Sequence, residues 1–182
     1  ANMPVGLIGL RDRALLLHGF AGAFRRSELV ALDVADIKEA EAGLRVYIRK
    51  SKTDQEGQGI TIGIALGTVA CPVKAVQAWI EAAGITEGPV FRSIAKGGRV
   101  SSMRLSDRSV ADIVKRHVSR IGLDPALFGG HSLRAGFLTS AAAKGASVFK
   151  MIDVSRHKSV DTLRGYVRDA ELFRDHAGAG LL

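Results

Sequence analysis

One of the two tyrosines in the chain lies in a segment whose side chains could support nucleophilic chemistry. Tyr166 stands in SVDTLRGYVRD (residues 159–169), nine positions after His157 in SRHKS. A tyrosine hydroxyl can form a covalent phosphoester, but its pKa of about 10 keeps it protonated at neutral pH unless a base or a positive field assists. Tyr166 is therefore either a nucleophile served by neighbouring groups or an aromatic side chain packed under a helix.

A histidine and an arginine form a second candidate pair. In GGHSLRAG, His131 and Arg134 are three residues apart, which places them on one face of a helix near its N-terminus. That end of a helix carries positive potential and free N–H groups, so it favours an anion. Such pairs also arise by chance, and the alternative is a surface pair or a capped core histidine.

Two further segments supply cations. GAFRRSELVAL contains Arg25 and Arg26, followed by Glu28. Adjacent arginines point to different helix faces, so we expect at most one to be buried and functional; the alternative for Arg25 is an exposed partner for Glu28. RKSKTDQEGQG places Lys50 and Lys52 at a predicted hairpin tip, where a lysine either reaches a neighbouring site or only keeps the tip solvated.

The elements that must position these residues are mostly helical. Residues 10–32 predict two helices separated near Gly22, and a further helix runs from Pro72 to before Gly84. Between them, GLRVYIR and ITIGIAL alternate with period 2 and predict a β-hairpin with a long polar tip. We therefore predict one mixed α+β domain over residues 1–182, predominantly helical, with a small antiparallel sheet inserted early.

Alternation along the first strand of this hairpin separates two faces. One face carries Leu44, Val46 and Ile48, and the other carries Arg45, Tyr47 and Arg49. No base lies near Tyr47 in sequence, so it is expected to be a surface or packing residue.

The second half of the chain predicts amphipathic helices. SDRSVADIVKRHVSRIG has a cap at Ser106 or Asp107, a stop at Gly122, and one apolar stripe comprising Val110, Ile113, Val114, His117, Val118 and Ile121. Lys115, Arg116 and Arg120 lie away from that stripe, on a solvated or phosphate-facing surface. HSLRAGFLTSAAAKG predicts another helix, closed by Gly145, and two or three short helices follow.

Composition limits the possible functions. The formal net charge of +8 over 182 residues favours a polyanionic partner, and the 5% aromatic content favours duplex DNA contacted through its phosphates. No apolar run approaches the roughly 20 residues that cross a bilayer, and the first residues lack a signal-peptide pattern. The single cysteine, Cys71, suits a reducing cytoplasm, so we expect a cytoplasmic, nucleoid-associated protein.

Metal and nucleotide cofactors are not expected. No pair of histidines has ligand spacing, and no phosphate-binding glycine loop follows a strand. His18 and His117 lie on apolar stripes and are expected to be satisfied core residues, while His176 sits in the tail.

The order and spacing of these residues resemble the catalytic domain of tyrosine recombinases, the phage integrase family. RRSEL resembles the first box of the family, SKTD its hairpin lysine, and HSLRAG its His-x-x-Arg box. RHKSVDTLRGY resembles the last box, in which a histidine or tryptophan precedes the nucleophilic tyrosine by nine residues. The resemblance runs from about Leu10 to beyond Phe173 and implies a tyrosine recombinase catalytic-domain fold.

The resemblance also implies site-specific DNA recombination through a covalent 3′-phosphotyrosyl intermediate. The catalytic residues it implies are Tyr166, Arg25, Lys52, His131, Arg134 and His157. Tyr166 would be the nucleophile, His131 its proton acceptor and Lys52 the general acid for the departing 5′ oxygen. Arg25 and Arg134 would clamp the phosphoryl oxygens, His157 would donate a hydrogen bond to them, and Glu28 would orient Arg25.

The implied partners are double-stranded DNA and further copies of the protein, a tetramer on DNA in the full-length form. Candidate DNA contacts are Arg26, Lys50, Arg156, Lys158, Lys115, Arg116 and Arg120. Two alternatives remain open at this point: a catalytically idle DNA-binding or regulatory module of the same fold, and a DNA-relaxing enzyme of the type IB topoisomerase kind.

Three features depart from the family pattern. Members usually carry a helical DNA-binding domain before this one, and nothing here matches it, so we expect an excised catalytic domain rather than a minimal form. Arg156 stands where many members have glycine, and it either adds a phosphate contact or has no role. The apolar tail residues Leu172, Phe173, Leu181 and Leu182 dock either onto a neighbouring protomer or back onto their own domain.

Overall fold

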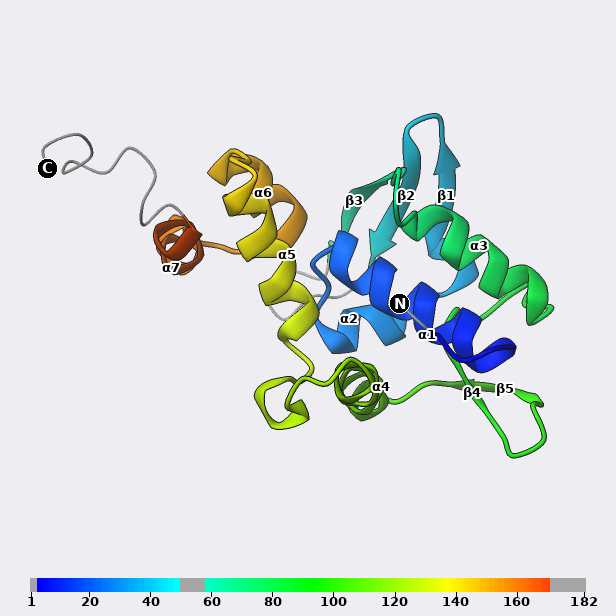
Figure 1. Ribbon diagram of the computed structural model, residues 1–182. Coiled ribbons are helices and arrows are strands. Elements are labelled where there is room, and N and C mark those ends of the chain that lie inside the picture. The colour runs from blue at the N-terminus through cyan, green and yellow to red at the C-terminus, as the bar shows by residue number, and fades with distance from the viewer. Residues whose placement is uncertain (1–2, 50–57, 171–182) are drawn as a thin grey trace, which may run out of the picture.

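The structure is a computed structural model that describes residues 3–49 and 58–170 (Figure 1). Lys50, Lys52 and the tail residues Leu172, Phe173, Leu181 and Leu182 lie outside the described residues. The helices are α1 (Leu7–Ala21), α2 (Arg26–Ala31), α3 (Pro72–Ala82), α4 (Asp107–Arg120), α5 (Ser132–Ala143), α6 (Val148–Ser155) and α7 (Val160–Ala170). The strands are β1 (Ile37–Ala40), β2 (Gly43–Ile48), β3 (Ile60–Ala65), β4 (Arg92–Ile94) and β5 (Val100–Arg104).

Most predicted helix boundaries are confirmed. The break near Gly22 separates α1 from α2, and α3 begins at Pro72 and ends before Gly84, whose φ is +61°. The Ser106 hydroxyl caps α4 by accepting a hydrogen bond from the Ser109 amide at 3.2 Å. The apolar stripe of α4 is buried at Val110, Ile113 and Val114, but Ile121 at its end is 62% exposed.

The predicted hairpin is confirmed as the antiparallel pair β2 and β3. Leu44 pairs with Ile64 and Val46 with Ile62, and these four side chains are buried. Tyr47 lies on the opposite, exposed face, where its hydroxyl donates to the Gln58 carbonyl at 3.1 Å, so its prediction as a surface residue is also confirmed.

Two parts of the sheet structure were not predicted. Strand β1 adds to the edge of β2, giving the order β1-β2-β3, and β4 pairs with β5 in a separate two-stranded sheet. Three of the four β1 residues are exposed, and all three β4 residues are half-buried. Neither segment therefore has the alternation of buried and exposed side chains from which a strand is predicted.

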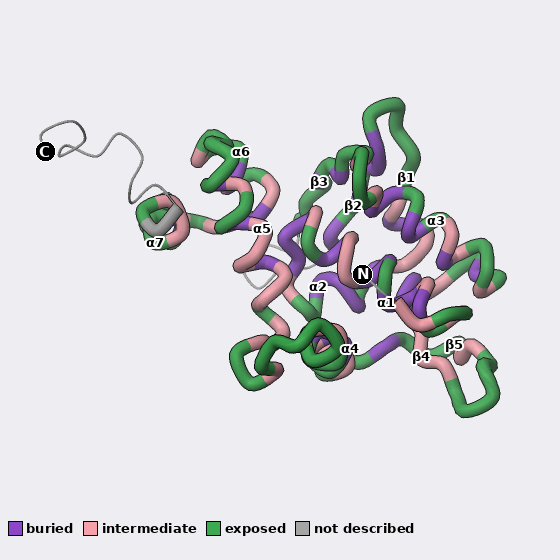
Figure 2. The backbone as a smooth tube through the Cα atoms, viewed as in Figure 1, coloured by how far each residue is buried: buried purple, intermediate pink, exposed green. Residues whose placement is uncertain are grey.

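The apolar interior of the described residues is divided between two clusters. The larger one joins α1, α2, α3 and α4 with the sheets, around side chains such as Leu15, Trp79 and Phe91. The smaller one lies between α5, α6 and α7 and consists of Leu138, Ala142, Met151 and Leu163 with partly buried neighbours. In Figures 1 and 2 these three helices extend to one side of the larger body.

A buried carboxylate joins α1 to α4. Asp12 is fully buried and accepts hydrogen bonds at 2.8 Å from Arg11, Arg116 and His117. His117 is thus the satisfied core histidine that was predicted. The Arg116 guanidinium pairs with Asp12 while its side chain remains 43% exposed, so its role as a phosphate contact stays a prediction.

His18 differs from its prediction. It is fully buried, but neither ring nitrogen has a hydrogen-bond partner among the described residues. Its ring stacks on Phe24 with centroids 5.6 Å apart. Burial lowers the pKa of His18 to about 4, so the ring is neutral at physiological pH.

Candidate active site

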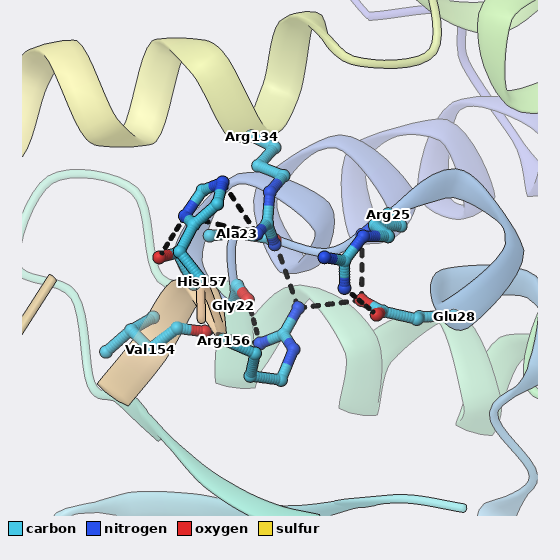
Figure 3. Close-up of polar contacts among 9 residues, drawn as sticks. Gly22, Ala23, Arg25, Glu28, Arg134, Val154, Arg156 and His157 are labelled. Carbon is cyan, nitrogen blue, oxygen red and sulfur yellow. Dashed lines mark hydrogen bonds and ion pairs between the residues drawn. The ribbon is translucent and has the colours of Figure 1, made fainter. Parts of the chain in front are cut away.

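Residues from three distant parts of the chain meet at the turn between α1 and α2 (Figure 3). Arg25 and Glu28 come from the start of α2, Arg134 from the first turn of α5, and Arg156 and His157 from the end of α6. The turn itself supplies the carbonyl oxygens of Gly22 and Ala23, which accept hydrogen bonds from these arginines.

Glu28 fixes Arg25 through two contacts. Its Oε1 accepts from the Arg25 guanidinium at 2.7 Å, and its Oε2 accepts from the Arg25 backbone N–H at 2.9 Å. The Arg25 side chain is 15% exposed, whereas that of Arg26 is 51% exposed and pairs with Asp107 at 3.1 Å. Arg25 is therefore the more buried of the two adjacent arginines, in agreement with the expectation that at most one is buried, and the partner that orients it is Glu28.

Arg134 points from α5 into the same cluster. One guanidinium nitrogen donates to the Ala23 carbonyl at 2.7 Å, and the other lies 3.1 Å from His157 Nε2. Burial and the nearby charges of Arg25 and Arg156 lower the pKa of Arg134 to about 10. The side chain therefore remains charged at neutral pH, in a site already rich in positive charge.

His157 is held between Arg134 and a hydroxyl. Its Nδ1 lies 2.8 Å from Ser155 Oγ. Burial and the charges of Arg134, Arg25 and Arg156 lower its pKa to about 4, so the ring is neutral at pH 7. A guanidinium can only donate, so Nε2 is the acceptor here and we assign the proton to Nδ1, which donates to Ser155.

Arg156 corrects a prediction. Its side chain is 4% exposed and turns into the domain, where it donates to Gly22 O at 2.9 Å and to Glu28 Oε2 at 2.7 Å. It also contacts the carbonyls of Ala23 and Val154 and lies over the Phe24 ring. A guanidinium in this position does not face solvent, so Arg156 is not a phosphate contact but part of the support of the cluster.

The backbone of Arg156 is unusual for an arginine. It adopts a left-handed conformation with φ +59° at the end of α6, a conformation that glycine adopts readily. An arginine there requires a separate structural reason.

Tyr166 and His131 lie around this cluster. Tyr166, on α7, is half-buried against the smaller apolar core, and it is one of the groups that surround Arg134. His131 is the exposed N-cap residue of α5, three positions before Arg134. The structure therefore brings Arg25, Arg134 and His157 together beside Tyr166. His131 stands at the end of the same helix as Arg134.

The other residues predicted to contact DNA are not part of this cluster. Lys158, Lys115 and Arg120 are exposed, which agrees equally with a solvated and with a phosphate-facing surface. Lys50 and Lys52, in the hairpin, are not among the described residues.

The cluster is suited to bind an anion. Three guanidinium groups (Arg25, Arg134, Arg156) against one carboxylate (Glu28) give a formal excess of 3 − 1 = +2 in a partly buried site. Guanidinium groups bind phosphate oxygens through paired hydrogen bonds and stabilise charge that develops on them. Within residues 3–49 and 58–170, no group of three His, Cys, Asp or Glu side chains could hold a metal ion, and no helix is long and apolar enough to cross a membrane.

Comparison with known proteins agrees with this geometry. The model of the phage integrase family matches residues 2–172. The integrase/recombinase XerD homologue of Selenomonas ruminantium is 43% identical over 173 residues, covering 94% of this chain and 51% of the relative. The tyrosine recombinase XerC of Pelotomaculum thermopropionicum is 30% identical over 165 residues, covering 88% of this chain and 47% of the relative. The chain thus spans about half the length of these curated relatives.

Solved recombinase structures share the fold. The XerH site-specific recombinase, in a post-cleavage complex with palindromic difH DNA, superposes with a TM-score of 0.77 at 16% identity, covering 100% of this chain and 48% of that one. The XerA recombinase superposes with a TM-score of 0.64 at 17% identity, covering 97% of this chain and 65% of that one.

Proposed function

The chain belongs to the phage integrase family, and on that basis we propose that it cleaves and rejoins DNA strands through a 3′-phosphotyrosyl intermediate at Tyr166. Residues 1–182 would form the catalytic domain of a site-specific recombinase that acts on double-stranded DNA in the cytoplasm, associated with the nucleoid. The observation that carries the proposal is the convergence of Arg25, Arg134 and His157 beside Tyr166.

The proposed reaction is a transesterification without a metal. The Tyr166 oxygen attacks the scissile phosphorus while the bond to the 5′ oxygen breaks, so one phosphodiester is replaced by a phosphotyrosyl ester and a free 5′ hydroxyl. His131 accepts the phenol proton and Lys52 supplies a proton to the leaving oxygen. The reverse attack by a 5′ hydroxyl rejoins the strand, so the bond energy is conserved.

Arg25 and Arg134 support the transition state. Their guanidinium groups neutralise the non-bridging oxygens, and Glu28 and the Ala23 carbonyl hold them in place beforehand. His157 donates to the same phosphate. Because its Nδ1 proton is directed at Ser155, phosphate binding requires the ring to turn or to exchange its proton between the two nitrogens.

We also propose that the protein acts as a homo-oligomer on DNA, a tetramer in its full-length form. An apolar groove of about 640 Å³ between α1, α4 and α5 supports this, because a second copy of the chain could cover it. Its lining includes Leu16, Leu17, Phe20, Val114, Arg120 and Leu133.

Covalent trapping tests the proposed chemistry. The protein is incubated with randomised duplex fragments and with fragmented genomic DNA from its source, quenched with detergent, and the DNA that remains attached is sequenced. Wild type and Tyr47→Phe should form adducts, whereas Tyr166→Phe should form none but still bind DNA. Tyr47 is a matched control because it is the other tyrosine and is exposed on β2.

Three outcomes distinguish the alternatives. Adducts that persist in Tyr166→Phe would contradict the nucleophile. DNA binding without adducts from wild type, at protein concentrations that saturate the DNA, would indicate an idle binding module. Adducts from wild type accompanied by relaxation of supercoiled DNA and no exchange between two sites would indicate the topoisomerase-like alternative.

A further inference from the structure

Two strained backbone positions meet beside the candidate active site. Among residues 3–49 and 58–170, Ala23 (φ +45°) and Arg156 (φ +59°) are the non-glycine residues with positive φ. They contact each other, because the Arg156 guanidinium donates to the Ala23 carbonyl at 3.1 Å. A left-handed conformation is unfavourable for a non-glycine residue, so it persists only where other contacts hold it in place.

The contacts of the Arg156 side chain provide that support. The backbone of Arg156 ends α6, but its guanidinium reaches the α1–α2 segment, where it binds Gly22 O, Ala23 O and Glu28 Oε2. Its guanidinium carbon also lies 5.3 Å from the centre of the Phe24 ring. The side chain therefore links two segments that are more than 125 residues apart in the sequence.

The Arg156 side chain lies between residues to which the proposed reaction assigns a role. Glu28 uses Oε1 for the Arg25 side chain and Oε2 for Arg156, so Arg156 fixes the carboxylate that orients Arg25. On its other side, Arg156 is bonded in the chain to His157, which contacts Arg134 (Figure 3). Helices α6 and α7 otherwise pack on α5 through their own small core.

We propose that Arg156 is a positioning residue for strand cleavage: its buried guanidinium fastens the end of α6, and with it His157 and the helix of Tyr166, to the turn that carries Arg25. This inference rests on the proposed function. Arg156 does not touch DNA and acts only through Glu28, the turn carbonyls and His157.

The variant Arg156→Gly distinguishes the effect of the backbone conformation at this position from the effect of the side-chain contacts. Arg156→Gly relieves the left-handed backbone but leaves Glu28 Oε2 and the two turn carbonyls without this donor. If only the backbone mattered, this variant would be at least as active as wild type. Arg156→Lys retains a charge but cannot make the paired contacts, and it should share the defect.

The kinetic test measures cleavage and binding separately. On a DNA site recovered by covalent trapping, Arg156→Gly should form adducts on the order of 10²-fold more slowly at saturating DNA, with its Kd for that DNA within about twofold of wild type. Lys150→Ala is the matched control, because Lys150 is an exposed cation on the same helix, α6. It should retain the cleavage rate.

A second test does not depend on activity. Arg156 is one of the charges that lower the pKa of His157 to about 4. The His157 pKa, measured by NMR titration of the ring, should therefore rise in Arg156→Gly and stay unchanged in Lys150→Ala. If Arg156→Gly unfolds, Arg156→Lys keeps the kinetic test available, because its cleavage rate should also fall.

The outcomes distinguish failure of this inference from failure of the proposed function. Weaker DNA binding with a shallower dependence on salt concentration, and a normal rate at saturation, would identify Arg156 as a phosphate contact and overturn the proposal. A wild-type rate together with an unchanged His157 pKa would overturn it as well. If wild type itself makes no adduct, the proposed function fails, and a His157 pKa that is unchanged in Arg156→Gly would separately overturn the inference about Arg156.

Discussion

Arg25 and Arg26 are adjacent in the chain but have different surroundings, and this contrast makes a sharp test of the site. The Arg25 guanidinium is held by Glu28 in a largely buried position, while Arg26 faces solvent and pairs with Asp107. Arg25→Lys should slow adduct formation by on the order of 10²–10³-fold, because lysine cannot present the paired donors that a phosphoryl group requires. Single-turnover trapping on a recovered DNA site measures the rate.

Arg26→Lys is the control for that measurement. It keeps the charge of a half-exposed side chain, so the rate should stay within a few-fold of wild type. If the two variants lost the same fraction of the rate of adduct formation, and thermal melting showed that both are folded, the assignment of Arg25 rather than Arg26 to the site would be wrong.

His18 predicts a pH dependence of stability. Its pKa is 6.5 in the unfolded chain and about 4 in the folded protein, so between these values the unfolded chain binds a proton that the folded protein does not. Stability therefore falls as the pH drops below 6.5, by about 2 kcal/mol at pH 5 from this residue alone. Urea unfolding at pH 7 and pH 5 measures the free energy of unfolding.

The matched variant is His18→Leu, which removes the titrating ring and the two unpaired nitrogens. Its loss of stability between pH 7 and pH 5 should be smaller than that of wild type by about 2 kcal/mol. The same pH dependence in both proteins would show that another group is responsible.

At the same scale, the members of the site could be predicted from the sequence but their support could not. The resemblance of short segments to the sequence boxes of the family identified Arg25, Arg134 and His157, which meet at the site. The direction of Arg156 could not be predicted, because it depends on two carbonyls and a carboxylate more than 125 residues away. The unpaired state of His18 likewise depends on which groups surround it.

At the scale of elements, the contact between α1 and α4 depends on one buried carboxylate. Asp12 accepts hydrogen bonds from Arg11 on its own helix and from Arg116 and His117 on α4. Asp12→Asn leaves the buried Arg11 guanidinium without its counter-charge and should lower the free energy of unfolding by about 3–5 kcal/mol. Urea unfolding provides the measurement.

Asp107→Asn is the exposed counterpart for comparison. Asp107 pairs with Arg26 where both side chains are about half exposed, so its loss should change stability by less than about 1 kcal/mol. A similarly small effect at Asp12 would show that α1 and α4 are joined by apolar packing alone.

The helices and the β2–β3 hairpin could be predicted from their caps, stops and alternation, whereas β1 and β4 were missed. The β2–β3 pair follows from strict alternation, and α4 from its cap and stripe. Strand β1 has only its first residue partly buried, and β4 is half-buried throughout, so their pairing is decided by neighbours rather than by their own residues.

At the scale of the whole molecule, the fold class could be predicted because it depends on the pattern of many residues together. The net charge is counted directly from the sequence. The net charge of +8 favours a polyanion, and the helical pattern with one hairpin matches the shared recombinase fold. The division of the interior into two clusters was not predicted, because the sequence shows which side chains are apolar but not which of them touch.

The division of the interior into two apolar clusters affects the order in which parts of the molecule unfold. The smaller cluster has only four fully buried side chains, while the larger one includes Leu15, Trp79 and Phe91 among many others. The free energy of opening such a small cluster is lower than the free energy of global unfolding. The smaller cluster therefore opens while the larger one stays folded. Amide protons of α6 and α7 should then exchange with solvent well before those of α1 and α3. Tyr166, the proposed nucleophile, would thus lie in the less protected of the two clusters of the described residues, where a local fluctuation of low free energy can move it away from the phosphate site.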